Sequence, residues 1–374
     1  MSARKILVTG GAGFIGSHLV EALASGGHTV RVLDVLDPQV HGSRTMKSFE
    51  SAEMLQGDVL DDAVLDQALK DVEVVFHQAA SVGVGQSMYE PAAYTRVNSL
   101  GTAMLMEKIA APGSKVEKVV VASSMSLYGE GKYACRSCGP AHPPPRGRER
   151  VERGKWEPEC PRCGLDLLPL PTDESVAPAP TSVYAVTKRC QEETVLLMGR
   201  AYGIPSVALR YFNVYGPGQS LSNPYTGVAA IFSSRILNGA PPVIFEDGMQ
   251  SRDFVHVSDI VQANLLAMER NEADYQVLNV GTGVRTPLLD LAQSLLVKLG
   301  ARDALKPSIA RSFREGDIRH CYADISKIRR TLGFEPRVSL EQGYEDLAEW
   351  ARTQRPVDRT DQAYGELRSR GLVR

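Results

Sequence analysis

The strongest restriction on the fold comes from a glycine-rich segment that directly follows an apolar stretch. Residues 4 to 8 are predicted to form a buried strand, and residues 14 to 26 have helical periodicity. Between them lies Thr9-Gly10-Gly11-Ala12-Gly13-Phe14-Ile15-Gly16. Residues without side chains permit a tight turn and a close approach of backbone N–H groups to a pyrophosphate, and the helix N-terminus adds partial positive charge. A glycine triplet alone would indicate only a tight loop, but the strand and the helix around it predict a dinucleotide-binding unit.

An acidic residue at the end of the next predicted strand, His28–Asp34, indicates which dinucleotide is bound. Asp34 lies 18 residues beyond Gly16, where a carboxylate accepts hydrogen bonds from the adenosine ribose and repels a 2′-phosphate. NAD is therefore expected rather than NADP. The alternative is that Asp34 only ends a strand and caps a turn. The segment Gly57-Asp58-Val59 resembles the turn that closes around the adenine. The expected NAD contacts in this half are Gly10, Gly13, Phe14, Ile15, Gly16, Asp34, Asp58 and Val59.

Further apolar segments alternate with helical ones, which predicts an α/β fold of the Rossmann type with a doubly wound parallel sheet. The predicted strands are Val72–Phe76, Lys118–Ala122 and Ser206–Arg210. We expect an NAD-binding domain from residues 1–132 and 181–212, an irregular insertion over 133–180 with neither strand nor helix, and a smaller α/β substrate lobe over 213–350. Residues 351–374 are charged and are expected to form a surface helix or to fray.

Composition limits the partners of this 374-residue chain. Its net charge of −2 provides no broad cationic field for nucleic acid or an anionic membrane. No apolar run reaches the roughly 18 residues that span a bilayer, and the first one is too short for a signal peptide. We expect a cytoplasmic protein that binds neither nucleic acid nor a membrane.

Three residues form a candidate catalytic group. Ser124 follows the strand at 118–122, and Tyr184 and Lys188 lie four residues apart, on one face of a predicted helix. A buried ammonium beside a phenol favours the phenolate and moves the tyrosine pKa from about 10 toward neutrality, as a general base requires. Lys188 can also hold the nicotinamide ribose, and Ser124 can bond the same substrate hydroxyl as Tyr184. A tyrosine and a lysine at this spacing also occur by chance in many helices.

Taken together, these motifs resemble the extended short-chain dehydrogenase/reductases, over roughly residues 4 to 350. Further motifs match in the family's order: His77-Gln78-Ala79-Ala80, Asn98 ahead of Gly101-Thr102, Arg210 to Pro217, Arg252 to Val257, and Arg314 to Asp317. The resemblance implies NAD contacts from Gln78, Ala79, Ala80, Asn98 and Phe212 in addition to Tyr184 and Lys188. It also implies a homodimer formed through helices near residues 98–112 and 184–202.

The substrate in that family is usually a nucleoside diphosphate sugar. By resemblance, Asn213, Arg252 and Arg314 lie where the diphosphate is held, Phe245 lies near the nucleobase, and Ser124 and Tyr184 contact the sugar. Guanidinium groups make charge-assisted hydrogen bonds to phosphate, which agrees with this assignment. Each arginine could instead be an ordinary surface charge.

The residues after Ser124 discriminate between the reactions of the family. Dehydratases that resemble this chain carry Asp-Glu where it has Met125 and Ser126, and methionine can neither donate nor accept a catalytic proton. Epimerisation at C4 needs only the base and NAD, through a transient 4-keto sugar. Decarboxylation of a UDP-hexuronate shares the first oxidation and is the alternative. The segment Ser81–Ser87 is neutral, which favours an uncharged sugar.

Four of the six cysteines form two C-x-x-C pairs, Cys135/Cys138 and Cys160/Cys163, each followed by a glycine. In a reducing compartment such pairs favour metal binding over disulfides. Four thiolates close a tetrahedral shell, which predicts a structural zinc ion; an iron–sulfur centre or redox-active dithiols are the alternatives. Cys190 and Cys321 lack partner spacing and are expected to be packed thiols.

The zinc-ribbon insertion, combined with Ser222-Asn223-Pro224-Tyr225-Thr226-Gly227, resembles bacterial 4-epimerases that convert dTDP-L-rhamnose to dTDP-6-deoxy-L-talose. Its position predicts a wall or lid beside the sugar pocket, or a subunit contact. A hypothesis of another class is a non-catalytic NAD-binding regulator that binds a partner through the ribbon and its arginines at 146 to 153. The interspersed Glu149 and Glu152 indicate a solvated loop there, and the intact Ser124, Tyr184 and Lys188 argue against a pure sensor.

Overall fold

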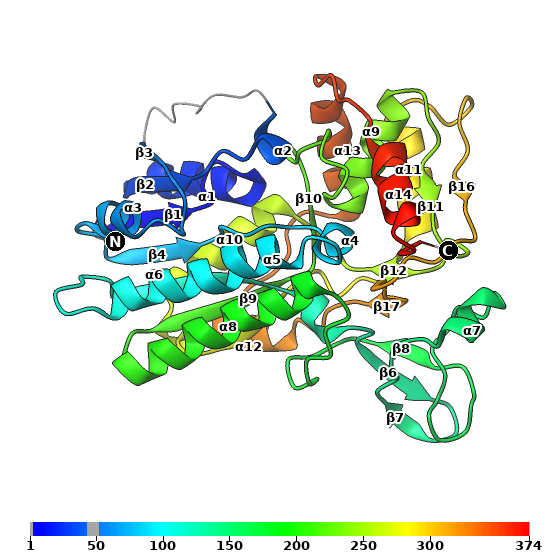
Figure 1. Ribbon diagram of the computed structural model, residues 1–374, viewed down its shortest axis with the longest axis horizontal. Coiled ribbons are helices and arrows are strands. Elements are labelled where there is room, and N and C mark those ends of the chain that lie inside the picture. Colours follow the sequence, from blue (N-terminus) through cyan, green and yellow to red (C-terminus); the bar gives the residue numbers. More distant parts are fainter. Residues whose placement is uncertain (1–2, 43–51, 374) are drawn as a thin grey trace.

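The computed structural model describes residues 3–42 and 52–373, so the ends of the predicted ranges 1–132 and 351–374 lie partly outside the described residues. A seven-stranded sheet forms its centre (Figure 1), and every neighbouring pair of its strands is parallel. In spatial order the strands are β14 (Val277–Val280), β9 (Ser206–Tyr211), β5 (Lys118–Ser124), β4 (Val74–His77), β1 (Lys5–Thr9), β2 (Thr29–Asp34) and β3 (Ala52–Gln56). The predicted Rossmann fold is confirmed.

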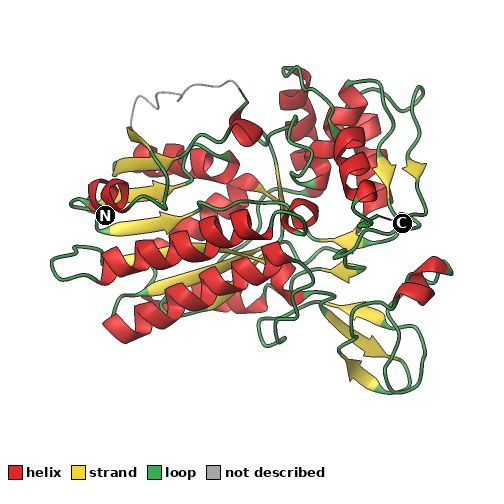
Figure 2. Cartoon of the chain, viewed as in Figure 1, coloured by secondary structure: helices red, strands yellow, loops and turns green. Residues whose placement is uncertain are grey.

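Alternation along the strands explains why helices cover both faces of the sheet (Figure 2). Ile6 and Val8 pack into one core, whereas Leu7 between them packs into the other. The first core receives α1 (Phe14–Ser25), α10 (Val257–Glu269) and α12 (Ser326–Leu332), and the second receives α3 (Asp62–Leu69), α6 (Gly101–Ala110) and α8 (Val183–Tyr202). Among the described residues, no helix is long and apolar enough to cross a bilayer.

The order of the strands places ligand binding at one edge. Strand β1 lies between β2 and β4, so the chain reverses its direction of progress across the sheet at this point. In open parallel sheets, ligands bind beyond the carboxyl ends of the strands at such a switch point. The glycine-rich turn after β1, the end of β5 and the second lobe all meet there.

A third core forms the second lobe. Its principal helices α9 (Val228–Leu237), α11 (Leu288–Lys298) and α13 (Leu340–Arg352) bury their apolar faces against each other. Short strands connect this lobe to the sheet and to the pocket: β10 (Asn213–Tyr215), β11 (Val243–Ile244), β12 (Ser251–Arg252), β13 (Phe254–His256), β15 (Thr286–Pro287), β16 (Ser308–Ile309) and β17 (His320–Cys321). Three short helices, α2 (Pro38–His41), α4 (Val84–Ser87) and α5 (Pro91–Tyr94), lie along the pocket on the side of the sheet.

The insertion at 133–180 is more regular than the sequence predicts. Strands β6 (Lys132–Cys135), β7 (Gly139–Ala141) and β8 (Leu168–Leu170) form an antiparallel sheet, and α7 (Arg148–Glu152) follows β7. Figure 1 shows these elements projecting beside β12 and β17. The expectation of neither strand nor helix was wrong because these strands have three or four residues and contain prolines and cysteines, so they show no alternating pattern.

The C-terminal segment is neither frayed nor a loose surface helix. Helix α14 (Thr360–Ser369) buries Ala363 and Leu367, which are 6% and 4% exposed. A side chain added at Gly85 of α4 would come within 3.3 Å of Leu367, so α14 packs against the sheet side of the pocket as well as the second lobe. Its charged outer face concealed these contacts in the sequence.

A buried ion pair holds α8 onto the sheet. Arg210 at the end of β9 forms two hydrogen bonds with Glu192 of α8, of 2.5 and 2.9 Å, and donates a third to the Tyr128 hydroxyl at 2.7 Å. The same carboxylate accepts a hydrogen bond of 2.6 Å from Ser123 in β5. Both charged side chains are about 5% exposed, so water cannot replace either partner.

We expect Glu192→Gln to lower the free energy of unfolding by about 3 kcal/mol, because it leaves the Arg210 charge buried without a carboxylate. The neighbouring Glu193 forms an exposed i,i+4 pair with Arg189, so Glu193→Gln should cost less than about 0.5 kcal/mol. Chemical denaturation of the two variants measures the difference. Equal losses would show that the buried pair does not hold α8.

Candidate active site

One cavity of about 1210 Å³ extends from the glycine-rich turn to the second lobe. It is larger than the pocket of a typical single small ligand. With the exception of Asn98, the predicted catalytic, cofactor and substrate residues all line it: Gly10, Gly13, Phe14, Ile15, Gly16, Asp34, Asp58, Val59, Gln78, Ala79, Ala80, Ser124, Tyr184, Lys188, Phe212, Asn213, Phe245, Arg252 and Arg314. The structure thus brings together residues that are up to 304 positions apart (314 − 10).

The glycine-rich turn leaves no space for a side chain at Gly10 or Gly16. Gly10 has φ +69°, in the left-handed region that favours glycine. A Cβ at Gly16 would lie 2.2 Å from the carbonyl oxygen of Gly10, and a Cβ at Gly10 would lie 2.8 Å from the Ala79 nitrogen. The first turn of α1 therefore packs directly on the loop, which leaves its N-terminus facing the cavity, as a pyrophosphate site requires.

Asp34 lies at the end of β2, on the cavity wall. Its carboxylate accepts hydrogen bonds from the backbone nitrogens of Ala12 (3.0 Å) and Leu36 (2.9 Å), and His41 lies 3.5 Å away. Burial raises its pKa, but His41 and these two N–H groups outweigh burial, so the pKa of Asp34 is lower than usual. The carboxylate is therefore ionised, and it both ends the strand and presents charge to the cavity.

Ser124 and Tyr184 meet at the centre of the cavity. Ser124 is the last residue of β5 and accepts hydrogen bonds from the backbone and hydroxyl of Ser126 at 3.1 and 2.9 Å. Tyr184 lies in the first turn of α8, where its backbone nitrogen donates to Ser87 at 3.0 Å. The hydroxyl of Ser124 lies beside that of Tyr184 and partly offsets the effect of burial on the pKa of the phenol. Both hydroxyls can therefore reach one substrate oxygen.

The charges of Tyr184 and Lys188 differ from the prediction. The Lys188 ammonium donates to the Ala122 carbonyl (2.8 Å) and the Gln191 amide oxygen (2.9 Å), and no hydrogen bond joins it to Tyr184. Burial raises the pKa of Tyr184 to about 12 and lowers the pKa of Lys188 to about 7. The expected shift of the phenol toward neutrality is wrong for the ligand-free chain, because desolvation disfavours the charged form of each group.

Asn98 supports the site from outside the cavity. It is fully buried within the π-helix η1 (Thr95–Leu100), a distortion that often marks functional sites. Its amide bonds the backbone of Ser81 through both oxygen (2.7 Å) and nitrogen (3.0 Å) and donates to Thr187 of α8 at 2.9 Å. The contact of Asn98 with the cofactor stays a prediction. Asn98 positions the segment after β4.

The second lobe supplies cationic groups to the cavity. Arg252 donates only to backbone carbonyls, those of Ser251, Arg319 and Ile318, so within the described residues its charge has no carboxylate in hydrogen-bond contact. Arg314 pairs with Asp317 at 2.7 Å and lies 5.6 Å above the ring of Phe245. A half-buried guanidinium without a carboxylate partner, such as that of Arg252, is suited to bind a phosphate group.

Unpaired oxygens on the same wall also point to a polar ligand. The side-chain amide oxygens of Asn213, Gln219 and Gln250 are buried and have no hydrogen-bond partner among the described residues. All three residues line the cavity. Buried polar atoms are rarely left unpaired in native proteins, so a ligand with several donors fits this wall.

Several cavity residues were not predicted from the sequence. Tyr364 of α14 stacks on Phe245 with ring centroids 5.7 Å apart, and the Tyr225 hydroxyl bonds the hydroxyl of Tyr89 (2.5 Å) and the carboxylate of Glu366 (2.8 Å). These contacts join segments distant in sequence, and a single tyrosine carries no local signal. Tyr225 lies within the quoted segment 222–227, which was the only available indication.

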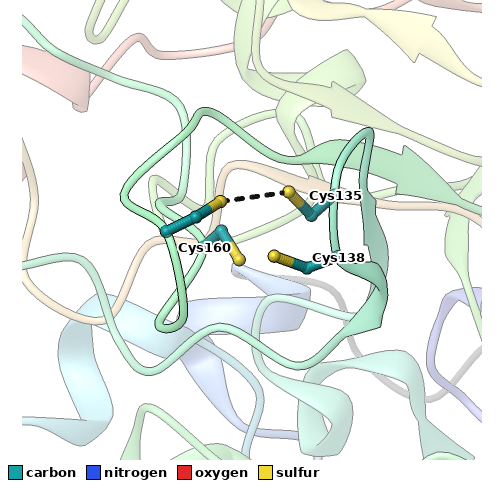
Figure 3. A group of neighbouring side chains, drawn as sticks. Cys135, Cys138 and Cys160 are labelled. Atoms are coloured by element: carbon teal, nitrogen blue, oxygen red, sulfur yellow. Dashed lines mark hydrogen bonds between the residues drawn. The ribbon is translucent and has the colours of Figure 1, made fainter.

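The four cysteines of the insertion form a compact cluster (Figure 3), in which the sulfurs of Cys135, Cys138 and Cys160 point toward a common centre. All four sulfurs lie within 4.8 Å of one another, and a tetrahedral zinc–thiolate site with bonds of about 2.3 Å separates its sulfurs by about 3.8 Å. Gly139 and Gly164 have φ +76° and +74°. They turn the chain as expected after each pair, so the residues fit a metal ion.

The remaining cysteines lie apart from this cluster. Cys321 is buried and Cys190 is half-buried. Cys321 donates weakly to the Thr172 hydroxyl at 3.8 Å, and burial raises the pKa of its thiol to about 12. Neither is a cluster ligand, as expected for packed thiols.

Comparisons with known proteins agree with this geometry. The chain is 37% identical over 354 residues to a dTDP-L-rhamnose 4-epimerase from Burkholderia thailandensis, which covers 94% of this chain and 95% of the relative. It is 28% identical to a UDP-N-acetyl-α-D-glucosaminuronate decarboxylase from Bacillus cytotoxicus, covering 93% and 98%.

Solved structures are similar over nearly the whole chain. The UDP-glucose 4-epimerase of Thermotoga maritima, solved with UDP-glucose, is 34% identical with a TM-score of 0.75 and covers 93% of this chain and 99% of its own. The Thermus thermophilus UDP-glucose 4-epimerase in complex with NAD is 30% identical with a TM-score of 0.73 and the same coverage. The model of the NAD dependent epimerase/dehydratase family matches residues 6–148 and 166–281, and the chain therefore belongs to this family.

Proposed function

We propose that the protein epimerises a nucleoside diphosphate sugar at C4, with NAD as a tightly held cofactor. The observation that carries this proposal is the meeting of Ser124 and Tyr184 in one cavity, between a glycine-rich turn and a cationic wall at Arg252. The turn and Asp34 suit the pyrophosphate and ribose of NAD, and the wall suits a second diphosphate. The Thermus relative was solved with NAD and the Thermotoga relative with UDP-glucose, which supports both assignments.

Each residue of the site has a separate role in the proposed reaction. The glycine-rich turn and Asp34 would hold NAD, which would supply a hydride acceptor and donor for C4. Tyr184 takes the proton of the C4 hydroxyl and gives it back, while Ser124 holds that hydroxyl in line. Lys188 holds the nicotinamide ribose. The sugar turns over as a 4-keto intermediate, so no net oxidation occurs.

The sugar site favours an uncharged hexose over a hexuronate. The backbone of Tyr184 donates to the Ser87 hydroxyl at 3.0 Å, and its ring packs edge-on against Tyr94, whose hydroxyl donates to Gln86 at 3.2 Å; these three partners are uncharged residue types. Gln86 in turn donates to the Glu90 carboxylate at 3.3 Å. Met125 is buried, and the hydroxyl of Ser126 is bonded to Ser124, so neither offers the acid and base of a dehydratase.

We propose dTDP-L-rhamnose and dTDP-6-deoxy-L-talose as the pair of substrate and product, supported by the Burkholderia relative. UDP-hexuronate decarboxylation is the second candidate, because a decarboxylase is among the relatives.

We further propose that the cysteine cluster binds a structural zinc ion and that two copies of the chain pair through α6 and α8. Four thiolates leave no open coordination position for a reaction. Leu100 at the end of η1 and Val186 and Leu197 on α8 are 48%, 52% and 65% exposed. Such apolar side chains on adjacent helices support a buried subunit contact.

The substrate proposal is tested by incubating the protein with dTDP-, UDP- and GDP-sugars and following C4 stereochemistry by NMR. We expect inversion at C4, fastest with dTDP-L-rhamnose or its talose epimer. Unchanged C4 configuration across the panel, with carbon dioxide released from a UDP-hexuronate, would replace epimerisation by decarboxylation.

Tyr184→Phe should lower kcat by about 10²-fold or more, because the proton acceptor is lost while the ring still packs on Tyr94. Bound NAD, measured by its absorbance after release, should remain. Tyr202→Phe at the exposed end of the same helix is the control and should keep full activity. Full activity of Tyr184→Phe would exclude it as the base.

Asp34→Ser should weaken NAD binding about tenfold and reduce the discrimination against NADP, since the carboxylate that repels the 2′-phosphate is gone. Calorimetry with cofactor-stripped protein measures both affinities. Asp61→Ser is the control: it changes the carboxylate that caps α3, and serine is an equally good cap. If the two variants bind NAD and NADP alike, Asp34 does not set the preference.

A further inference from the structure

The insertion reaches the substrate cavity through one buried arginine. Arg146 belongs to the arginine-rich stretch 146–153, for which the sequence predicts a solvated loop, yet its side chain is 1% exposed. The prediction fails at this residue because carboxylates from outside the insertion enclose it. Arg146 donates to Glu130 at 2.9 Å and to Glu246 at 2.8 Å. The exposed Arg148, two residues further on, fits the prediction.

Arg146 also contacts the backs of two cavity segments. Glu246 follows Phe245 directly, so the ion pair holds the segment that carries that ring. The third guanidinium nitrogen donates to the Asp317 carbonyl at 3.1 Å, and the guanidinium lies 5.2 Å above the ring of Phe313. Phe313 and Asp317 flank Arg314. One side chain of the insertion therefore ties together the two segments that present Phe245 and Arg314 to the cavity.

A second connection strengthens this arrangement. Glu157, also in the insertion, bonds Arg319 at 2.6 Å and the His320 ring at 3.0 Å. Arg319 reaches the same Glu246 at 2.8 Å, and its backbone nitrogen donates to Glu130 at 2.6 Å. Glu246 and Glu130 are thus shared between the insertion and the strand that follows Arg314. Such a network is held only when all its members are in place.

The insertion has little core of its own to hold Arg146 in place. Its buried apolar cluster consists of Tyr133, Cys135, Ala141, Cys160 and Leu167, which is too small to fold without a cross-link. In the sequence, Arg146 lies between the two cysteine pairs. A metal ion held by the four sulfurs would therefore close the loop that contains Arg146 and Glu157 and fix both ends of it.

We propose that the cysteine cluster acts on the nucleotide wall through Arg146: when the cysteines hold a metal ion, Arg146 keeps Phe245 and Arg314 in the geometry that binds the nucleoside diphosphate. Arg146 is a positioning residue, since it bonds the residues next to these two and does not line the cavity. NAD binding and the step at C4 involve the opposite half of the cavity and do not depend on it. This inference rests on the proposed binding of a nucleoside diphosphate sugar.

The test compares Arg146→Gln with Arg148→Gln in the metal-loaded full chain. Arg148 forms an ion pair with the exposed Glu152 of the same helix, so Arg148→Gln removes the same charge from the stretch 146–153 without a change at the wall. We expect Arg146→Gln to raise the Kd for dTDP or UDP, measured by calorimetry, and the KM for the nucleotide sugar about tenfold. Its kcat, NAD content and metal content should match those of Arg148→Gln. Arg146→Lys, which keeps one charged donor, should restore part of the affinity.

Loss of the metal site should also weaken binding of the nucleoside diphosphate. Cys163→Ser takes away an exposed ligand, and metal analysis should show its loss together with a nucleotide Kd raised as in Arg146→Gln. The double variant should bind no more weakly than either single variant, because both break one chain of contacts. Additive losses, or unchanged nucleotide affinity in Arg146→Gln and Cys163→Ser, would overturn the proposal. If the wild-type protein binds no nucleoside diphosphate at all, the proposed function itself fails, and this inference fails with it.

Discussion

The ion pair between Glu192 and Arg210 is the interaction on which the geometry of the site depends. The carboxylate of Glu192 belongs to α8, which carries Tyr184 and Lys188, and it also accepts a hydrogen bond from Ser123, the residue before Ser124. One buried group therefore fixes the helix with the proposed base relative to the strand that ends at the assisting hydroxyl. Catalytic groups need positions held within a fraction of an ångström, and shared buried partners provide this.

Local sequence signals predicted the parts of the fold and the site that depend on local geometry. The glycines before α1 could be assigned to a dinucleotide-binding turn because a Cβ at Gly16 has no space. The cysteine pairs could be assigned to a metal site because the two cysteines of each pair are close in the sequence. Strand β14 was not predicted. It has four residues and pairs on one side only, so it is too short to show a recognisable strand pattern. The contacts of Tyr364 and Arg146 depend on which surfaces meet after folding. The charged residues around both in the sequence instead predict that these segments are exposed to solvent. Burial also moves the pKa of Tyr184 opposite to the expected direction and lowers the pKa of Lys188, which residue spacing alone cannot reveal.

Burial opposes the charged forms of both Tyr184 and Lys188. It raises the pKa of the phenol and lowers the pKa of the ammonium, because each group is removed from water. A positive charge near the phenol is needed to favour the phenolate, because an opposite charge within about 6 Å offsets desolvation. The nicotinamide ring of the oxidised cofactor carries such a charge. The role of base that is proposed for Tyr184 therefore requires a positive charge beside the phenol.

The insertion at 133–180 is attached to the second lobe. It leaves the domain after β5 and returns before α8, and its two ends are tied together where the backbone of Lys132 donates to the hydroxyl of Thr172 at 3.1 Å. Because Thr172 is itself bonded to the backbone of Tyr322 at 2.8 Å, the junction is anchored on the second lobe rather than on α8. A displacement of the insertion at this junction would therefore act on the second lobe. If the four cysteines hold a metal ion, as proposed, the insertion would act on the nucleotide wall through contacts of this kind, since none of its residues 133–180 lines the cavity.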